Sequence, residues 1–131
     1  MKLENQICSL ELARRLKMLG FEQESLFYWV MMYPGALVLS GPSWIIHTAD
    51  EFENIKVLPE EDWMAYPAYT AAELGEMLPS HIKQHSMFVD RFHDKWLIGY
   101  SYVYDDDKPF MNTEADAKAE LLIWLKENNL L

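Results

Sequence analysis

Seven consecutive residues, at positions 26–32, are large and apolar: Leu-Phe-Tyr-Trp-Val-Met-Met. Aromatic and β-branched residues of this kind favour a β-strand. Because the side chains of a strand alternate between its two sides, both faces of this strand are apolar. A strand with one face in water would alternate polar and apolar residues. We therefore expect cover on both faces, from a helix, another sheet or a second subunit.

The residues that follow indicate a hairpin. Tyr33-Pro34-Gly35-Ala36 is typical of a tight turn, because proline presets φ and glycine accepts positive φ. Residues 37–39 return from this turn, and residues 43–48 predict a further strand. The span 25–49 carries no formal charge and is long enough to cross a bilayer, but its Pro-Gly and Gly-Pro pairs would expose open backbone to lipid. We expect a buried hairpin and no membrane segment.

Capping patterns mark three helices. Ser9 precedes leucines at helical spacing, and Gly20 follows them. Thr70-Ala71-Ala72-Glu73 is a capping box, and the helix that it begins is stopped by Pro79. Thr113 caps a last helix with an apolar face. The acidic stretch 50–62 predicts a solvated connection with a short strand at 55–58.

Strands at 87–92 and 96–104 flank a charged tip at residues 93–95 and form a second hairpin. The whole chain, residues 1–131, is therefore expected to be a single α+β domain. An antiparallel sheet built from the two hairpins would be packed by the N-terminal and C-terminal helices.

Composition excludes several classes of protein. Half of the 131 residues are hydrophobic, which supplies a core that needs no disulfide bonds. The net charge of −10 repels polyanions and argues against direct nucleic-acid binding by phosphate neutralisation. The single cysteine, Cys8, fits a reducing compartment, and charges interrupt the N-terminal residues where a signal peptide would be apolar. We expect a cytoplasmic protein.

The strand 96–104 carries a candidate binding surface. Alternation places Trp96, Tyr100, Tyr102 and Tyr104 on one of its faces. Such a row suits a rigid platform for a peptide, a sugar or a partner subunit. The same row is equally typical of a core face beneath a helix, and both interpretations stay open.

A histidine pair is the candidate metal site. His81 and His85 are four residues apart, a spacing that on a helix would place both on one face. Asp90 and His93 are possible further ligands. Surface histidines around a loop and a hairpin are the alternative, because no glutamate follows His81 to act as a base. No catalytic residue and no cofactor are assigned.

Several blocks carry a resemblance. Residues 8–20 (CSLELARRLKMLG), 23–29 (QESLFYW), 69–79 (YTAAELGEMLP) and 112–131 resemble a family of small uncharacterised proteins from bacteriophages and prophage-like elements of gut bacteria. The resemblance implies a setting, a mobile-element protein in a bacterial cytosol. It carries over no activity and no catalytic residue.

These observations favour a non-enzymatic protein-interaction module, because aromatics and eight methionines abound while no catalytic set converges. The partner is a host protein or a second copy, and the doubly apolar strand at 26–32 makes a homodimer plausible. One alternative is a small metal-dependent hydrolase using His81, His85 and Asp90. Another is an acidic DNA mimic that occupies a host nucleic-acid-binding protein through stretches 50–62 and 105–107. The simplest interpretation of this charge is solubility.

Overall fold

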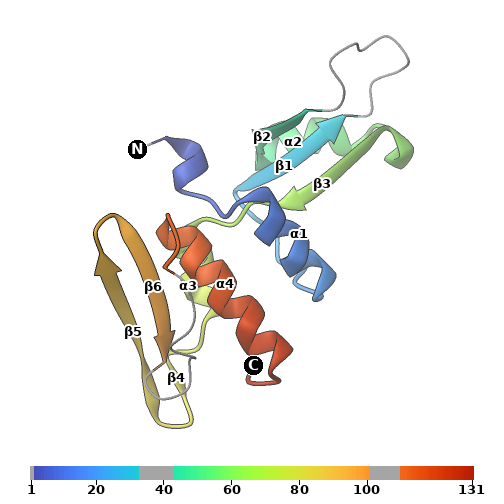
Figure 1. Cartoon of the computed structure of the whole chain (residues 1–131). Coiled ribbons are helices and arrows are strands. Elements are labelled where there is room, and N and C mark those ends of the chain that lie inside the picture. Colours follow the sequence, from blue (N-terminus) through green and yellow to red (C-terminus); the bar gives the residue numbers. More distant parts are fainter. Residues whose placement is uncertain (1, 33–42, 101–109) are drawn as a thin grey trace.

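The computed structural model describes residues 2–32, 43–100 and 110–131. Within these ranges the chain forms four α-helices and two three-stranded antiparallel sheets, which confirms the predicted α+β class. Helices lie near both ends of the chain, as expected (Figure 1). In chain order the elements are η1 (Leu3–Asn5), α1 (Leu10–Met18), β1 (Phe27–Met32), β2 (Trp44–Thr48), α2 (Ala49–Lys56), η2 (Glu60–Asp62), β3 (Trp63–Pro67), α3 (Ala71–Met77), β4 (His81–Ile82), β5 (His85–Phe92), β6 (Lys95–Tyr100) and α4 (Glu114–Glu127).

The apolar strand β1 lies at the centre of the first sheet, whose order is β2-β1-β3. On one face α2 packs against it, with the Phe52 ring 4.3 Å from the ring of Tyr28. On the other face α1 packs against β3, and the Trp29 indole N–H donates a 3.0 Å hydrogen bond to the backbone oxygen of Cys8. The chain's own helices therefore flank both faces of β1. The composition of this strand no longer requires a second subunit.

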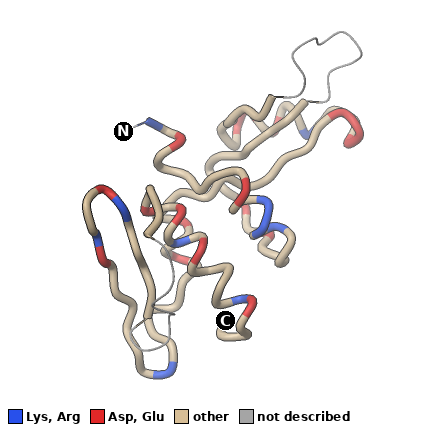
Figure 2. The backbone as a smooth tube through the Cα atoms, in the orientation of Figure 1, with Lys and Arg blue, Asp and Glu red and all other residues tan. Residues whose placement is uncertain are grey.

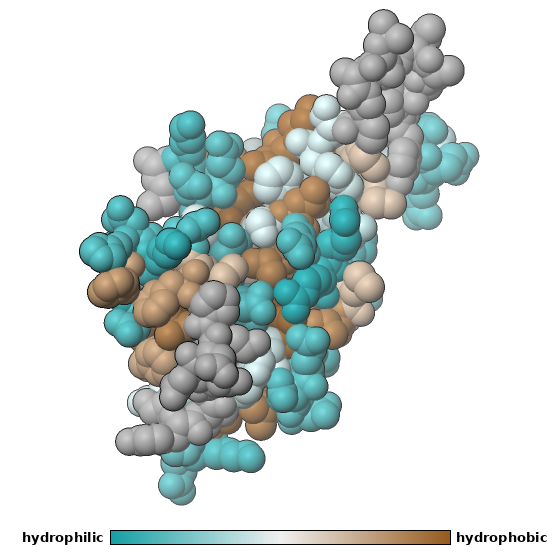
Figure 3. All heavy atoms as spheres, viewed as in Figure 1, coloured by the Kyte–Doolittle hydropathy of each residue, from teal (hydrophilic) through white to brown (hydrophobic). Residues whose placement is uncertain are grey.

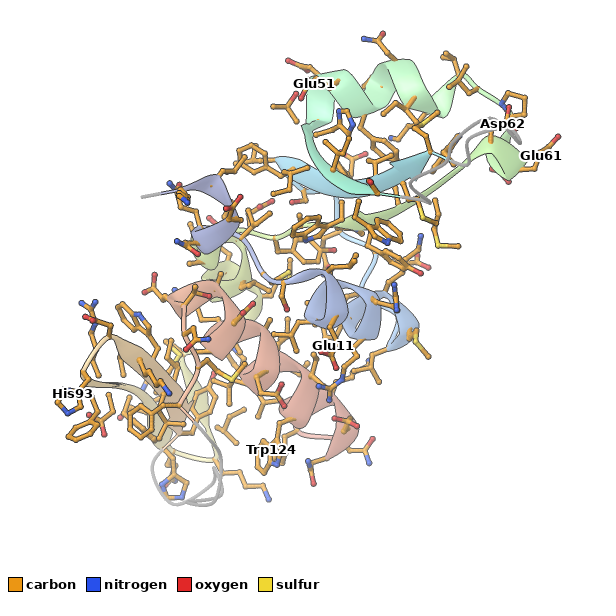
Figure 4. The ribbon with its side chains drawn as sticks, turned by 45° about the horizontal axis from the view of Figure 1, so that its top comes forward. Glu11, Glu51, Glu61, Asp62, His93 and Trp124 are labelled. Atoms are coloured by element: carbon orange, nitrogen blue, oxygen red, sulfur yellow. The ribbon has the colours of Figure 1, made fainter. Side chains whose placement is uncertain are left out.

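The main core lies around α4, between the two sheets (Figures 1 and 4). This helix packs against α1, α3 and β6. Six of its residues have no exposed surface: Ala115, Ala119, Leu121, Leu122, Ile123 and Leu125. The helix begins where the sequence predicts, because the Thr113 hydroxyl accepts the N–H of Asp116 at 3.1 Å.

The strands of the two predicted hairpins lie in different sheets. Residues 63–67, for which no strand was predicted, form β3 and pair with β1. This pairing occupies the second edge of β1, so the second hairpin does not pair with β1. It forms a separate sheet of order β4-β5-β6, which packs on α4 through β6.

The acidic stretch also differs from expectation, because the predicted strand at 55–58 is wrong. Residues 49–56 are helical, and a capping box begins the helix: the Thr48 hydroxyl accepts the N–H of Glu51 at 3.2 Å, while the Glu51 carboxylate accepts the N–H of Thr48 at 2.8 Å. The predicted turn at 33–36, the strand at 37–39 and the last part of the strand 96–104 lie outside the described residues. Among the described helices, none combines the length and the apolar composition that crossing a bilayer requires.

Candidate functional site

The structure describes two residues of the predicted aromatic row, Trp96 and Tyr100, and their surroundings differ. Tyr100 has no exposed surface, lies in the main core, and its hydroxyl donates to the backbone oxygen of Pro79. Burial raises the pKa of the Tyr100 hydroxyl, so the group stays protonated as a donor. Tyr100 is therefore a core residue and not part of an exposed binding platform. Tyr102 and Tyr104 lie outside the described residues.

Trp96 is half-buried and lines a pocket of about 880 Å³ with Arg91, whose guanidinium lies 4.6 Å from the Trp96 ring centroid. The starts of α3 and α4 form the opposite walls. The Thr70 and Thr113 hydroxyls that reach this pocket already accept capping hydrogen bonds from backbone N–H groups. Among the described residues that line this pocket, no base stands beside a free nucleophile.

The four predicted metal ligands are spread over a hairpin. His81 lies on β4 and His85 on β5, joined by two residues of positive φ, so the helical geometry assumed for the pair is wrong. His81 is paired with Ser86, so alternation places it on the sheet face opposite to that of His85. Asp90 is exposed farther along β5, and the exposed His93 lies in the next turn (Figure 4). In the part of the chain that the structure describes, no three His, Cys, Asp or Glu side chains come together as a metal site.

Cys8 is not placed as a nucleophile. Its side chain has no exposed surface, and burial raises the pKa of the thiol from 9.0 to about 12. Nucleophilic cysteines need the thiolate form, which this environment suppresses. Asp116 stands close by and accepts the backbone N–H of Ser9 at 2.7 Å, although burial raises the pKa of its carboxyl. The buried Cys8 side chain and the hydrogen bond from Ser9 to Asp116 join the start of α1 to the main core.

The structure brings together a surface that the sequence did not single out. In the first sheet, Trp29 is opposite Ile46 and Tyr66, and Met31 is opposite Trp44 and Met64. Residues directly opposite one another in antiparallel strands share a face of the sheet. We call this surface the aromatic sheet face and define it by these six residues: Trp29, Met31, Trp44, Ile46, Met64 and Tyr66.

The aromatic sheet face is only partly covered. All six of its side chains retain exposed surface. On the other face of the sheet, Val30 is 1% exposed in the central strand, and Ile45 is 56% exposed in the edge strand β2. Helix α1 lies over one end of the face, and Figure 3 shows brown and pale spheres, the colours of apolar and aromatic residues, gathered at the surface over the first sheet. A sheet face of this composition is normally buried completely.

Two cations of α1 lie on the aromatic sheet face. The Arg14 guanidinium carbon is 5.6 Å from the Tyr66 ring centroid and 6.0 Å from that of Trp44, and the Lys17 nitrogen is 5.2 Å from Tyr66. Arg14 is exposed and forms no ion pair with the described residues, whereas Arg15 pairs with two carboxylates of α4. The basic residues of α1 stand beside the first sheet in Figure 2. The surface is therefore aromatic and locally positive on a chain of net charge −10.

The sequence indicates only the basic part of this site. Arg14 and Lys17 are three residues apart, which places them on one side of a helix. That this side faces the aromatic rings depends on how α1 packs on the sheet. Comparisons with models of protein families, with curated proteins and with solved structures found no match to this chain.

Proposed function

We propose that the protein is a non-enzymatic interaction module that binds a segment of another protein on the aromatic sheet face. The observation that carries this proposal is an apolar sheet face that stays partly open, with Arg14, which forms no ion pair with the described residues, lying across it. Exposed apolar patches bordered by polar groups typically mark interaction sites. Tryptophan, tyrosine, methionine and arginine are also the residues enriched at protein interfaces.

The chemistry of the face selects the kind of segment. Trp44 and Tyr66, with ring centroids 5.5 Å apart, present apolar surface for an aliphatic or aromatic side chain. Arg14 presents a guanidinium fork that suits a carboxylate. The partner segment therefore combines apolar and acidic side chains, and its binding weakens as salt screens the charge on Arg14.

The resemblance to bacteriophage and prophage proteins supports a host protein in a bacterial cytosol as the partner. The hydrolase and DNA-mimic alternatives gain no specific support. The DNA mimic requires stretches 50–62 and 105–107 to form one acidic surface, and the second of these stretches lies outside the described residues.

An anionic aromatic probe tests the face without knowledge of the partner. We expect anilinonaphthalene sulfonate to bind the folded protein with increased fluorescence, because its rings suit Trp44 and its sulfonate suits Arg14. Arg14→Ser is expected to weaken the affinity about tenfold, the equivalent of about 1.4 kcal/mol. Trp44→Ser is expected to weaken it at least as much.

Arg15→Ser is the matched control for this titration. It removes the same charge from the same helix, but Arg15 points to Glu120 and Glu127 of α4. Its affinity for the probe should stay at the wild-type value. Equal affinities for the Arg14→Ser and Arg15→Ser proteins, both with wild-type circular dichroism, would show that the aromatic sheet face is not the binding surface.

A further inference from the structure

Met64 is the most exposed residue of the aromatic sheet face. It is 36% exposed, whereas the other five residues of this face are half-buried. Its sulfur accepts a hydrogen bond from the Tyr66 hydroxyl at 3.4 Å. We propose that Met64 is an oxidative modification site, at which a peroxide converts the thioether to a sulfoxide and thereby weakens binding on the aromatic sheet face. This inference rests on the proposed function and adds a means of regulating it.

The oxidation of Met64 needs only the thioether and the peroxide. The sulfur attacks one oxygen of hydrogen peroxide, the O–O bond breaks, and an S=O bond forms with water as the second product. Sulfur loses two electrons, and the peroxide gains them. A methionine sulfoxide reductase reverses the step with two thiols, which form a disulfide and release the oxygen as water. Binding on the face can therefore be switched in both directions.

The register of the first sheet places Met64 beside the groups that the proposed function uses. Met64 is opposite Met31 of the central strand, and Met31 is opposite Trp44 on its other side. Tyr66 follows Met64 by two residues, so both side chains lie on the same face. The Tyr66 ring centroid is 5.5 Å from that of Trp44 and 5.6 Å from the Arg14 guanidinium carbon. A chemical change at Met64 therefore alters the surface that a bound segment would contact.

Oxidation reverses the polarity of this side chain. The thioether is apolar and a weak hydrogen-bond acceptor, whereas the sulfoxide is polar and its oxygen binds water. A bound apolar side chain would cover this oxygen and displace its water, which costs free energy unless a donor replaces it. The Tyr66 hydroxyl supplies at most one donor, as it does to the sulfur of the reduced side chain. We expect binding about tenfold weaker after oxidation of Met64.

Met32 is the matched control, because it has a similar exposure on the opposite face of the same sheet. It is 40% exposed and lies opposite Trp63 of β3. Alternation along β3 places Trp63 and Met64 on opposite faces. Peroxide should therefore oxidise both exposed methionines, and only the sulfoxide at Met64 should change binding on the aromatic sheet face.

Titration of the full chain with anilinonaphthalene sulfonate before and after mild hydrogen peroxide treatment tests the proposal. Peptide mass spectrometry locates the sulfoxides, and each protein is compared with itself before treatment. The wild type and Met32→Leu are expected to lose affinity about tenfold and to regain it after treatment with methionine sulfoxide reductases and dithiothreitol. The affinity of Met64→Leu, which lacks the sulfur, should not change with treatment. Met64→Gln should bind more weakly than Met32→Gln without any oxidant.

An unchanged affinity of the wild type once Met64 is a sulfoxide overturns the proposal, as does an unoxidised Met64 in protein whose Met32 has reacted. An equal loss in treated Met64→Leu also contradicts it, because another methionine would then cause the loss. If peroxide changes the circular dichroism, the comparison of Met64→Gln with Met32→Gln decides, and equal affinities overturn the proposal. Failure of the proposed function is a separate result, in which untreated Arg14→Ser and Arg15→Ser bind the probe equally.

Discussion

Tyr100→Ser is expected to lower the free energy of unfolding by about 3–5 kcal/mol, in the range measured when a buried aromatic side chain is truncated. The Tyr100 ring has no exposed surface and packs in the main core. Its loss leaves a cavity and also removes the hydroxyl that donates to Pro79. A loss of this size is a large part of the stability of a small domain. Urea unfolding followed by circular dichroism measures it.

Two variants separate the parts of this effect. Tyr100→Phe keeps the ring and removes only the hydrogen bond, for an expected loss of about 1–2 kcal/mol. Phe92→Ser truncates an aromatic residue that is 63% exposed on the same hairpin, and its effect should stay within about 0.5 kcal/mol. If the Tyr100→Ser protein were as stable as the Phe92→Ser protein, Tyr100 would belong to a surface platform and not to the core.

Glu73→Ala is expected to cost about 2–4 kcal/mol, because one carboxylate holds three donors. One oxygen accepts the N–H of Thr70 at 2.9 Å and the hydroxyl of Ser25 at 3.1 Å, and the other accepts the N–H of Leu26 at 3.2 Å. Ser25 is buried. The side chain therefore caps α3 and also fixes the chain where it enters β1. Chemical denaturation with the same optical signal measures the loss.

Glu51→Ala is the matched control, since Glu51 occupies the same position in the capping box of α2. Glu51 is exposed, and its capping hydrogen bond is local to Thr48. We expect a clearly smaller loss of stability from Glu51→Ala than from Glu73→Ala. Equal losses would mean that the bonds from Glu73 to Ser25 and Leu26 add nothing, and that α3 is not tied to β1 in this way.

The helix starts were predictable because capping is local chemistry. Ser9, Thr70 and Thr113 each accept a backbone N–H three residues later, as their sequences indicate. The same pattern is present at Thr48-Ala49-Asp50-Glu51, where the dense negative charge suggested a solvated connection instead. The division into two sheets was not predictable, because it depends on the pairing of β3 with β1 across the intervening elements.

The candidate site, too, could be predicted from the sequence only in part. Alternation placed Trp96 and Tyr100 on one strand face, but it could not say that Tyr100 lies beneath α4. The histidine spacing suggested a helix, whereas Lys83 and Gln84 adopt positive φ and turn the chain into a hairpin. The aromatic sheet face requires the register of three strands and the position of α1. These are long-range contacts, which no local pattern reports.

A comparison of three immobilised baits in a bacterial lysate tests most directly whether the aromatic sheet face binds protein. The baits are the wild type, the double variant Arg14→Ser/Trp44→Ser and the control Phe92→Ser, with bound proteins quantified by mass spectrometry. We expect at least one protein to be retained about tenfold more by the wild type and by Phe92→Ser than by the double variant, and to be released as salt rises. Equal retention of every bound protein by all three baits would contradict the account.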